Sequence, residues 1–136
     1  MRRLMPLILA LVVACGSDST VSPNPTPASL AGTWALQNIN GALLPFTLSQ
    51  TDTSKTELLS DVVTAVVAGT YTEVAQLRTT VKGQATLASG SDAGTYTLVG
   101  NALTFRSVDG STITGTLNNT SFTIAAGGVA FEYKKQ

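Results

Sequence analysis

Apolar and polar residues alternate through the last third of the chain, with the period of two that predicts β-strands. The alternating segments read "TYTLV", "ALTFRSV", "STITGTL", "TSFTIAA" and "VAFEYKK". Turn-forming dipeptides separate them and begin nine residues apart, at Gly100-Asn101, Asp109-Gly110, Asn118-Asn119 and Gly127-Gly128. The seven residues left between two such turns are one strand of ordinary length. We therefore predict consecutive antiparallel hairpins.

Each turn also predicts which residues face each other, because partners across a hairpin share one face of the sheet. A two-residue turn at Asp109-Gly110 would place Ile113 opposite Arg106, so we expect a three-residue loop, residues 108–110, with Gly110 in a bulge. The predicted partners are Tyr96 with Phe105, Leu98 with Leu103, Phe105 with Ile113, Ile113 with Ile124, Gly115 with Phe122, Ile124 with Phe131, and Phe122 with Tyr133.

The two faces of this predicted sheet differ in chemistry. The outer face is polar and rich in threonine: Thr95, Thr97, Thr104, Arg106, Thr112, Thr114, Thr116, Thr123, Glu132 and Lys134. The inner face is bulky and apolar: Tyr96, Leu98, Leu103, Phe105, Ile113, Leu117, Phe122, Ile124, Phe131 and Tyr133. Such a sheet encloses its apolar side by curling, and Gly115 in mid-strand would ease the bend. We predict an all-β fold, an antiparallel up-and-down β-barrel.

The first half of the chain is less regular. We expect strands at "GTWALQNI" and "LPFTLSQ" around a turn at Asn40-Gly41, and a long strand "TYTEVAQLRTTV" after Gly69. The run "TELLSDVVTAVV", residues 56–67, is ambiguous, because its apolar residues recur in pairs every four positions, as on a buried helix face. Its β-branched residues and the turn-like "AGTY" that follows favour a strand. The barrel would then have about eight to nine strands.

The only cysteine of the chain, Cys15, follows a segment that is typical of a secretory signal. Arg2 and Arg3 precede an apolar run that ends at Ala14, and eleven helical residues span only about 16 Å, too little for a membrane helix. The residues before Cys15 resemble a bacterial lipobox. This resemblance implies cleavage after Ala14 and lipidation of Cys15, palmitate included, which gives a stable membrane anchor. An ordinary signal peptide with a chance cysteine is the alternative.

The sequence after Cys15, "GSDSTVSPNPTPA", has too little apolar surface to join a core and predicts a flexible tether. The expected organisation is a signal peptide at residues 1–14, the lipidated cysteine and tether at residues 15–28, and one domain at residues 29–136. Gly16 after the cysteine favours the outer membrane under the enterobacterial sorting pattern. We therefore expect a lipid-anchored protein of the cell envelope, at the outer membrane or the periplasmic face.

The predicted domain resembles the bacterial lipocalin-like proteins, a calycin-type group. The similar motifs are "GTW" on the first strand, "AGTYTEV", "DAGTYTLVGNALTF", "VDGSTITGTL" and the final "FEYKK". The resemblance implies a barrel that binds a small hydrophobic molecule. It also implies that Trp34 packs across one barrel end beneath a basic side chain, for which the candidates are Lys134, Arg106 and Arg78.

The composition argues against catalysis, metal binding and nucleic-acid binding. The chain has no histidine, its acids are scattered singly, and its serines and threonines lack a base to activate them. We therefore expect no enzyme activity, no metal site and no cofactor. Loss of residues 1–14 would remove Arg2 and Arg3, which leaves six basic and eight acidic residues and a net charge of −2. Such a chain is not basic enough to bind nucleic acid.

Glu73 shares its strand parity with Tyr71, Ala75 and Leu77, which would place its carboxylate inside the barrel. There it could bind an amine or alcohol headgroup. Because an unpaired buried charge is costly, we expect instead that the strand twists and that Glu73 reaches solvent.

Two functions from different classes are compatible with such a barrel, because a small barrel is either filled by its own side chains or holds one small ligand. If it holds a small hydrophobic ligand, the predicted lining residues are Tyr96, Leu98, Phe105, Ile113, Phe122, Ile124, Phe131 and Tyr133. If it is filled, we expect a non-enzymatic interaction or structural module of the envelope, which uses its threonine-rich face or the segment at residues 50–56.

Overall fold

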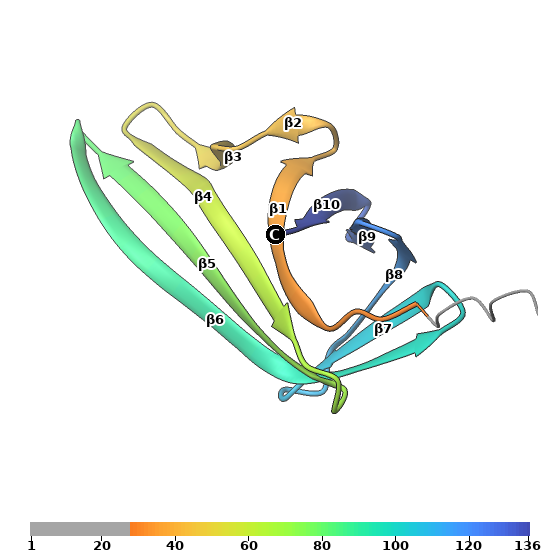
Figure 1. Cartoon of the computed structure of the whole chain (residues 1–136). Coiled ribbons are helices and arrows are strands. Elements are labelled where there is room, and N and C mark those ends of the chain that lie inside the picture. The colour runs from red at the N-terminus through yellow and green to blue at the C-terminus, as the bar shows by residue number, and fades with distance from the viewer. Residues whose placement is uncertain (1–27) are drawn as a thin grey trace, which may run out of the picture.

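The computed structural model describes residues 28–136; the predicted signal peptide, Cys15 and the tether up to residue 27 lie outside the described residues. The described chain is all-β, with no helix, as the alternation predicts (Figure 1). Its strands are β1 (Gly32–Ile39), β2 (Ala42–Leu43), β3 (Phe46–Gln50), β4 (Ser54–Ala65), β5 (Thr70–Val81), β6 (Gln84–Val99), β7 (Ala102–Ser107), β8 (Thr112–Asn118), β9 (Ser121–Ala126) and β10 (Val129–Lys135). The ambiguous run at residues 56–67 belongs to β4 up to Ala65.

The sheet closes into a barrel because β1 pairs with β10 on one side and with β4 on the other. The eight strands β1, β10, β9, β8, β7, β6, β5 and β4 follow one another around it, and the predicted antiparallel up-and-down β-barrel is confirmed. The short strands β2 and β3 are additional.

The predicted strand "LPFTLSQ" is present from Phe46 onward as β3, but it does not pair with the first strand across the turn at Asn40-Gly41. The turn at Asn40-Gly41 is present, and β2 pairs with β1 as expected. After Leu43 the chain leaves β1, and from Phe46 it pairs with β4 instead. Pro45 lies at the crossing, where its missing N–H could not continue a ladder of hydrogen bonds.

The C-terminal hairpins confirm most of the predicted partners. The confirmed pairs are Tyr96–Phe105, Leu98–Leu103, Phe105–Ile113, Ile124–Phe131 and Phe122–Tyr133. The three-residue loop between β7 and β8 is also confirmed, since the Ser107 N–H donates to the Ser111 carbonyl at 3.0 Å and Gly110 has a φ of +89°. The turn residues therefore predicted both the position and the length of this loop.

The hairpin between β8 and β9 has a different register. The two predicted pairs that do not form are Ile113–Ile124 and Gly115–Phe122. Gly115 lies opposite Ile124, because the turn consists of residues 119–120. A shift of two residues leaves every side chain on its predicted face, so alternation alone could not choose between the registers. In this register a Cβ at position 115 would collide with the main-chain oxygen of Thr123.

The strands β4, β5 and β6 are longer than the barrel is tall (Figure 1). The pairing of β1 with β4 covers only residues 62–65 of β4, and that of β7 with β6 only residues 94–99 of β6. The outer parts of the three strands, with β3 along one edge, project from the barrel as a sheet that we call the extension. The extension comprises residues 46–50, 54–60, 76–81 and 84–90.

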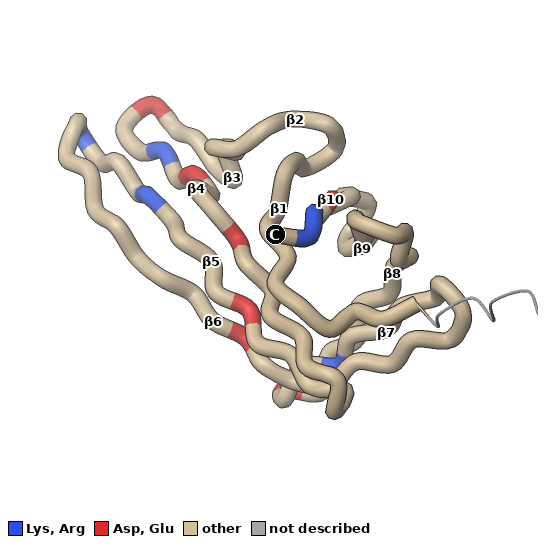
Figure 2. The backbone as a smooth tube through the Cα atoms, viewed as in Figure 1, with Lys and Arg blue, Asp and Glu red and all other residues tan. Residues whose placement is uncertain are grey.

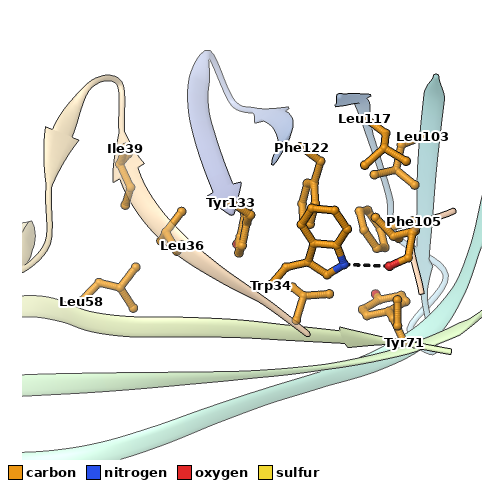
Figure 3. Close-up of a cluster of buried hydrophobic side chains, with 13 residues drawn as sticks. Trp34, Leu36, Ile39, Leu58, Tyr71, Leu103, Phe105, Leu117, Phe122 and Tyr133 are labelled. Carbon is orange, nitrogen blue, oxygen red and sulfur yellow. Dashed lines mark hydrogen bonds between the residues drawn. The ribbon is translucent and has the colours of Figure 1, made fainter. Parts of the chain in front are cut away.

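An aromatic core closes one end of the barrel (Figure 3). Trp34 is completely buried, and its indole N–H donates to the Leu30 carbonyl at 2.7 Å. The Trp34 ring meets Phe122 edge-on at 5.2 Å between centroids, and Phe122 stacks on Tyr133 at 4.6 Å. Such pairs each add about 0.5–1.5 kcal/mol beyond the burial of their area. The described strand pairings and core contacts all lie within residues 30–135, so this part of the chain encloses its own core.

The basic side chain over Trp34 belongs to Lys135, whose ammonium nitrogen lies 5.4 Å from the ring centroid. Trp34 and Lys135 are direct partners across β1 and β10, and partners share a face. The three predicted candidates are therefore wrong. Lys134 alternates to the opposite face of β10, Arg106 is exposed on β7, and Arg78 lies in the extension.

Candidate binding pocket

A pocket lies inside the barrel, between the closed end at Trp34 and the loop that joins β7 to β8. Its volume is about 40 Å³, enough for a few water molecules or for a group of a few heavy atoms. The lining residues are Val63, Tyr71, Glu73, Asp92, Phe105, Ser107, Ser111, Ile113, Phe122, Ile124 and Tyr133. Ser111 is exposed, so the pocket reaches solvent beside the β7–β8 loop.

Five of the eight predicted lining residues border this pocket: Phe105, Ile113, Phe122, Ile124 and Tyr133. The other three, Tyr96, Leu98 and Phe131, pack against the core without bordering it. Leu98 lies next to the β6–β7 turn, towards the end that Trp34 closes, and packs against the core there. Tyr96 points its hydroxyl outward, to the Val66 carbonyl at 2.8 Å.

Three inward-facing carboxylates lie on adjacent strands beside the pocket. Glu73 on β5 is the direct partner of Asp92 on β6, and Asp61 on β4 is the partner of Ala75, one inward position further along β5. The expected turning of Glu73 out of the barrel is wrong: the pairing of β5 with β6 runs without a bulge, so Glu73 stays on the inner face beside Tyr71, where it is half-buried. Strand parity indicated this position, but the two neighbouring acids that alter the cost of burial are far away in sequence.

Asp92 is held by two hydroxyl groups. The Tyr71 hydroxyl donates to one carboxylate oxygen at 2.7 Å and the Ser107 hydroxyl to the other at 2.5 Å. Burial opposes ionisation of Asp92, but the hydrogen bonds from Ser107 and Tyr71 outweigh it and hold the pKa of this carboxyl below its usual range. Asp92 is therefore ionised at neutral pH.

Glu73 is the member that keeps its proton. Burial raises its pKa to about 8, and the charge of Asp61 and a hydrogen bond to it contribute in the same direction. Burial also raises the pKa of Asp61, although a hydrogen bond from the Tyr133 hydroxyl, at 2.8 Å, opposes the shift. Asp61 is only 6% exposed, and its second oxygen has no hydrogen-bond partner. Two adjacent acids that cannot both ionise cheaply share a proton.

No further charged side chain among the described residues lines the pocket, although Asp109 lies in the β7–β8 loop beside it and accepts from the Ser111 N–H at 2.7 Å. Figure 2 shows other acidic and basic residues along β4 and β5. On the extension, Glu57 accepts from Arg78 at 2.8 Å and lies 2.6 Å from the Lys55 ammonium. Hydrogen bonds from Lys55 and then Arg78 lower the pKa of Glu57. In this ion cluster the negative charge of Glu57 is compensated, whereas no Lys or Arg of the described chain lines the pocket.

The fold and the pocket together define a closed antiparallel barrel with an acidic, aromatic interior. Comparisons of the chain with protein-family models, with curated proteins and with solved structures give no match. Among residues 28–136, no group of three or more His, Cys, Asp or Glu side chains is placed to hold a metal ion. The same residues include no helix that is long and apolar enough to cross a membrane.

Proposed function

We propose that this protein is a lipid-anchored envelope protein whose lipocalin-like barrel binds a small, largely hydrophobic molecule. The observation that carries the proposal is the pocket inside the barrel, which has aromatic and aliphatic walls and a few convergent polar groups, the usual composition of a small-molecule site. The anchor and the envelope location rest on the N-terminal sequence, through Cys15 and the segment before it.

The size of the pocket limits what it holds. A volume of about 40 Å³ takes only the buried part of a ligand, a group of a few heavy atoms. Any longer part of the molecule would leave through the open side beside Ser111 and lie against Ile113. A ligand with one small buried end fits this geometry better than a fully enclosed lipid.

A filled barrel that serves as an interaction module is the second candidate, and the extension favours it. Residues 84–90 of β6 pair only with β5, and an unpaired strand edge can accept an extended segment of a partner. Leu87 and Val81 on the same sheet are exposed, at 69% and 46%. This candidate predicts that the barrel carries no ligand.

Native mass spectrometry of residues 28–136, produced in bacteria and purified without detergent, tests both candidates. We expect a reproducible small-molecule adduct, which organic extraction then identifies. Ile113→Phe would fill the pocket and abolish the adduct, whereas Val99→Phe, at a 77% exposed position at the end of β6, would leave it intact. A clean protein mass, together with no uptake of a hydrophobic fluorescent probe, would contradict the binding function and favour the interaction module.

A further inference from the structure

We propose that the ligand carries a primary amine and that Glu73 and Asp92 bind its ammonium group inside the barrel. This inference rests on the proposed function and specifies the chemistry of the same pocket.

The first argument is the uncompensated charge of the cluster. Asp61, Glu73 and Asp92 point into the barrel from three adjacent strands, and the pocket has no basic side chain in its lining. Like charges placed directly opposite each other on a sheet are destabilising, and Glu73 and Asp92 would form such a pair if both were ionised. A cation between the two carboxylates would reverse that repulsion.

The second argument is an unsatisfied buried atom. Asp61 is 6% exposed, and apart from the proton that it shares with Glu73 its only side-chain donor is the Tyr133 hydroxyl, which leaves Oδ1 without another partner. Buried polar atoms are nearly always hydrogen-bonded, so an unpartnered carboxylate oxygen behind Glu73 indicates that the cluster is incomplete without a further donor. Without a ligand, the proton on Glu73 meets part of this need. An ammonium group bound to Glu73 and Asp92 would bring three N–H donors to the pocket side of the same cluster.

The third argument concerns which cation fits. A primary ammonium is compact, whereas a guanidinium is a broad planar fork, and the pocket volume is about 40 Å³. The carboxylate oxygens of Asp92 each accept one hydroxyl hydrogen bond already and have lone pairs left for the ligand. The pocket is also lined by the aromatic residues Tyr71, Phe105 and Phe122, and aromatic walls can attract an ammonium group. The apolar part of the amine would lie against Ile113, towards the opening.

Binding of the amine then competes with the proton on Glu73. The groups that face Glu73 are Asp61 on β4, Asp92 on β6, and the hydroxyls of Tyr71 on β5 and Tyr133 on β10. All of them are acids or neutral hydroxyls, so an ammonium group is the first positive charge in the site. Its arrival favours the ionised form of Glu73, and the proton is released to solvent. Affinity for the amine should therefore rise with pH until Glu73 is ionised in the free protein.

Isothermal titration of residues 28–136 with three probes of equal chain length tests the inference: hexylamine, hexanol and hexanoate. We expect hexylamine to bind at least about tenfold more tightly than hexanol, and hexanoate not to bind. Glu73→Gln and Asp92→Asn should each weaken hexylamine by about tenfold or more, while Asp52→Asn, an exposed acid in the β3–β4 loop, should not change it. Both amides keep an oxygen that accepts hydrogen bonds, and circular dichroism would verify that the variants are folded.

The pH dependence separates an ionic role from a structural one. Between about pH 6 and about pH 9 the wild-type affinity for hexylamine should rise, and in Glu73→Gln it should stay flat. Equal binding of hexylamine and hexanol, or wild-type affinity in both amide variants, would overturn the amine inference and leave the proposed function standing. A co-purified ligand without a basic nitrogen would do the same. Failure of all three probes together with a clean native mass would remove the proposed function itself.

Discussion

Replacement of Glu73 by glutamine should change the pH dependence of stability more than stability itself. In the folded protein the pKa of Glu73 is about 8, against an ordinary value of 4.5. A group whose pKa is raised by folding stabilises the native state fully below its unfolded pKa, and this contribution is lost as pH rises through the folded pKa. Wild-type stability should therefore decline from about pH 5 to about pH 9, and Glu73→Gln should not share the decline.

The expected size of the effect follows from the shift. Each pKa unit corresponds to about 1.4 kcal/mol, so a fully buried, isolated group with this shift would contribute about 5 kcal/mol. Glu73 is only half-buried and borders the open pocket, and screening by solvent should reduce the contribution to about 2 kcal/mol. Glutamine cannot ionise, and its side-chain N–H₂ replaces the proton that Glu73 shares with Asp61.

Urea unfolding at several pH values, followed by tryptophan fluorescence, measures this prediction. Above about pH 5 Asp92 stays ionised, because its pKa lies below the usual range, so the response of the cluster comes from the proton that Glu73 shares with Asp61. We expect Glu73→Gln to match the wild type near pH 5 and to exceed it by about 2 kcal/mol near pH 9. The control Asp52→Asn should follow the wild type throughout. Parallel stability curves for the wild type and Glu73→Gln would refute the assignment of a protonated, inward Glu73.

Three further substitutions test the fold, the site and the anchor. Gly115→Ala should destabilise the barrel by about 3 kcal/mol, because its Cβ would collide with a main-chain oxygen. The control Gly90→Ala, whose Cβ meets no atom within 4 Å, should be neutral or slightly stabilising. Equal urea midpoints for the two variants would contradict the β8–β9 register. Tyr133→Phe removes the hydroxyl that donates to Asp61 and should lower the free energy of unfolding by about 1–3 kcal/mol in the same assay. A change near zero would be incompatible with this hydrogen bond. Cys15→Ser should abolish incorporation of radiolabelled palmitate and release the protein from membranes; persistent labelling would remove Cys15 as the lipidation site.

The C-terminal strands could be predicted from the sequence because their hairpins are local. Turn type depends on a few adjacent residues such as Gly110, and alternation within one strand determines which side chains face inward. The register between β8 and β9 could not be predicted, because a shift of two residues preserves both the alternation and the faces. The choice there depends on how closely two backbones approach at Gly115, a contact between strands.

The acidic site could be predicted only in part. Parity placed Glu73 on the inner face, but the cost of burying a single charge argued for the opposite orientation. That cost depends on groups from other strands: Asp61, which shares the proton, and Asp92, which takes the negative charge with two hydroxyl donors. Similarly, the cation over Trp34 was attributed to the wrong residue, because the pairing of β1 with β10 selects Lys135.

The sequence by itself determined most of the strands, the turns and the apolar face, since each depends on neighbours within about ten residues. It also predicts a lipid anchor at Cys15, which lies outside the described residues. The tertiary structure alone decided how the barrel closes, which strands extend beyond it, and that three carboxylates meet beside one small pocket. The physical reason is that burial, charge and protonation depend on distances through space, and the pairing of β4, β5 and β6 brings together Asp61, Glu73 and Asp92 from separate parts of the chain.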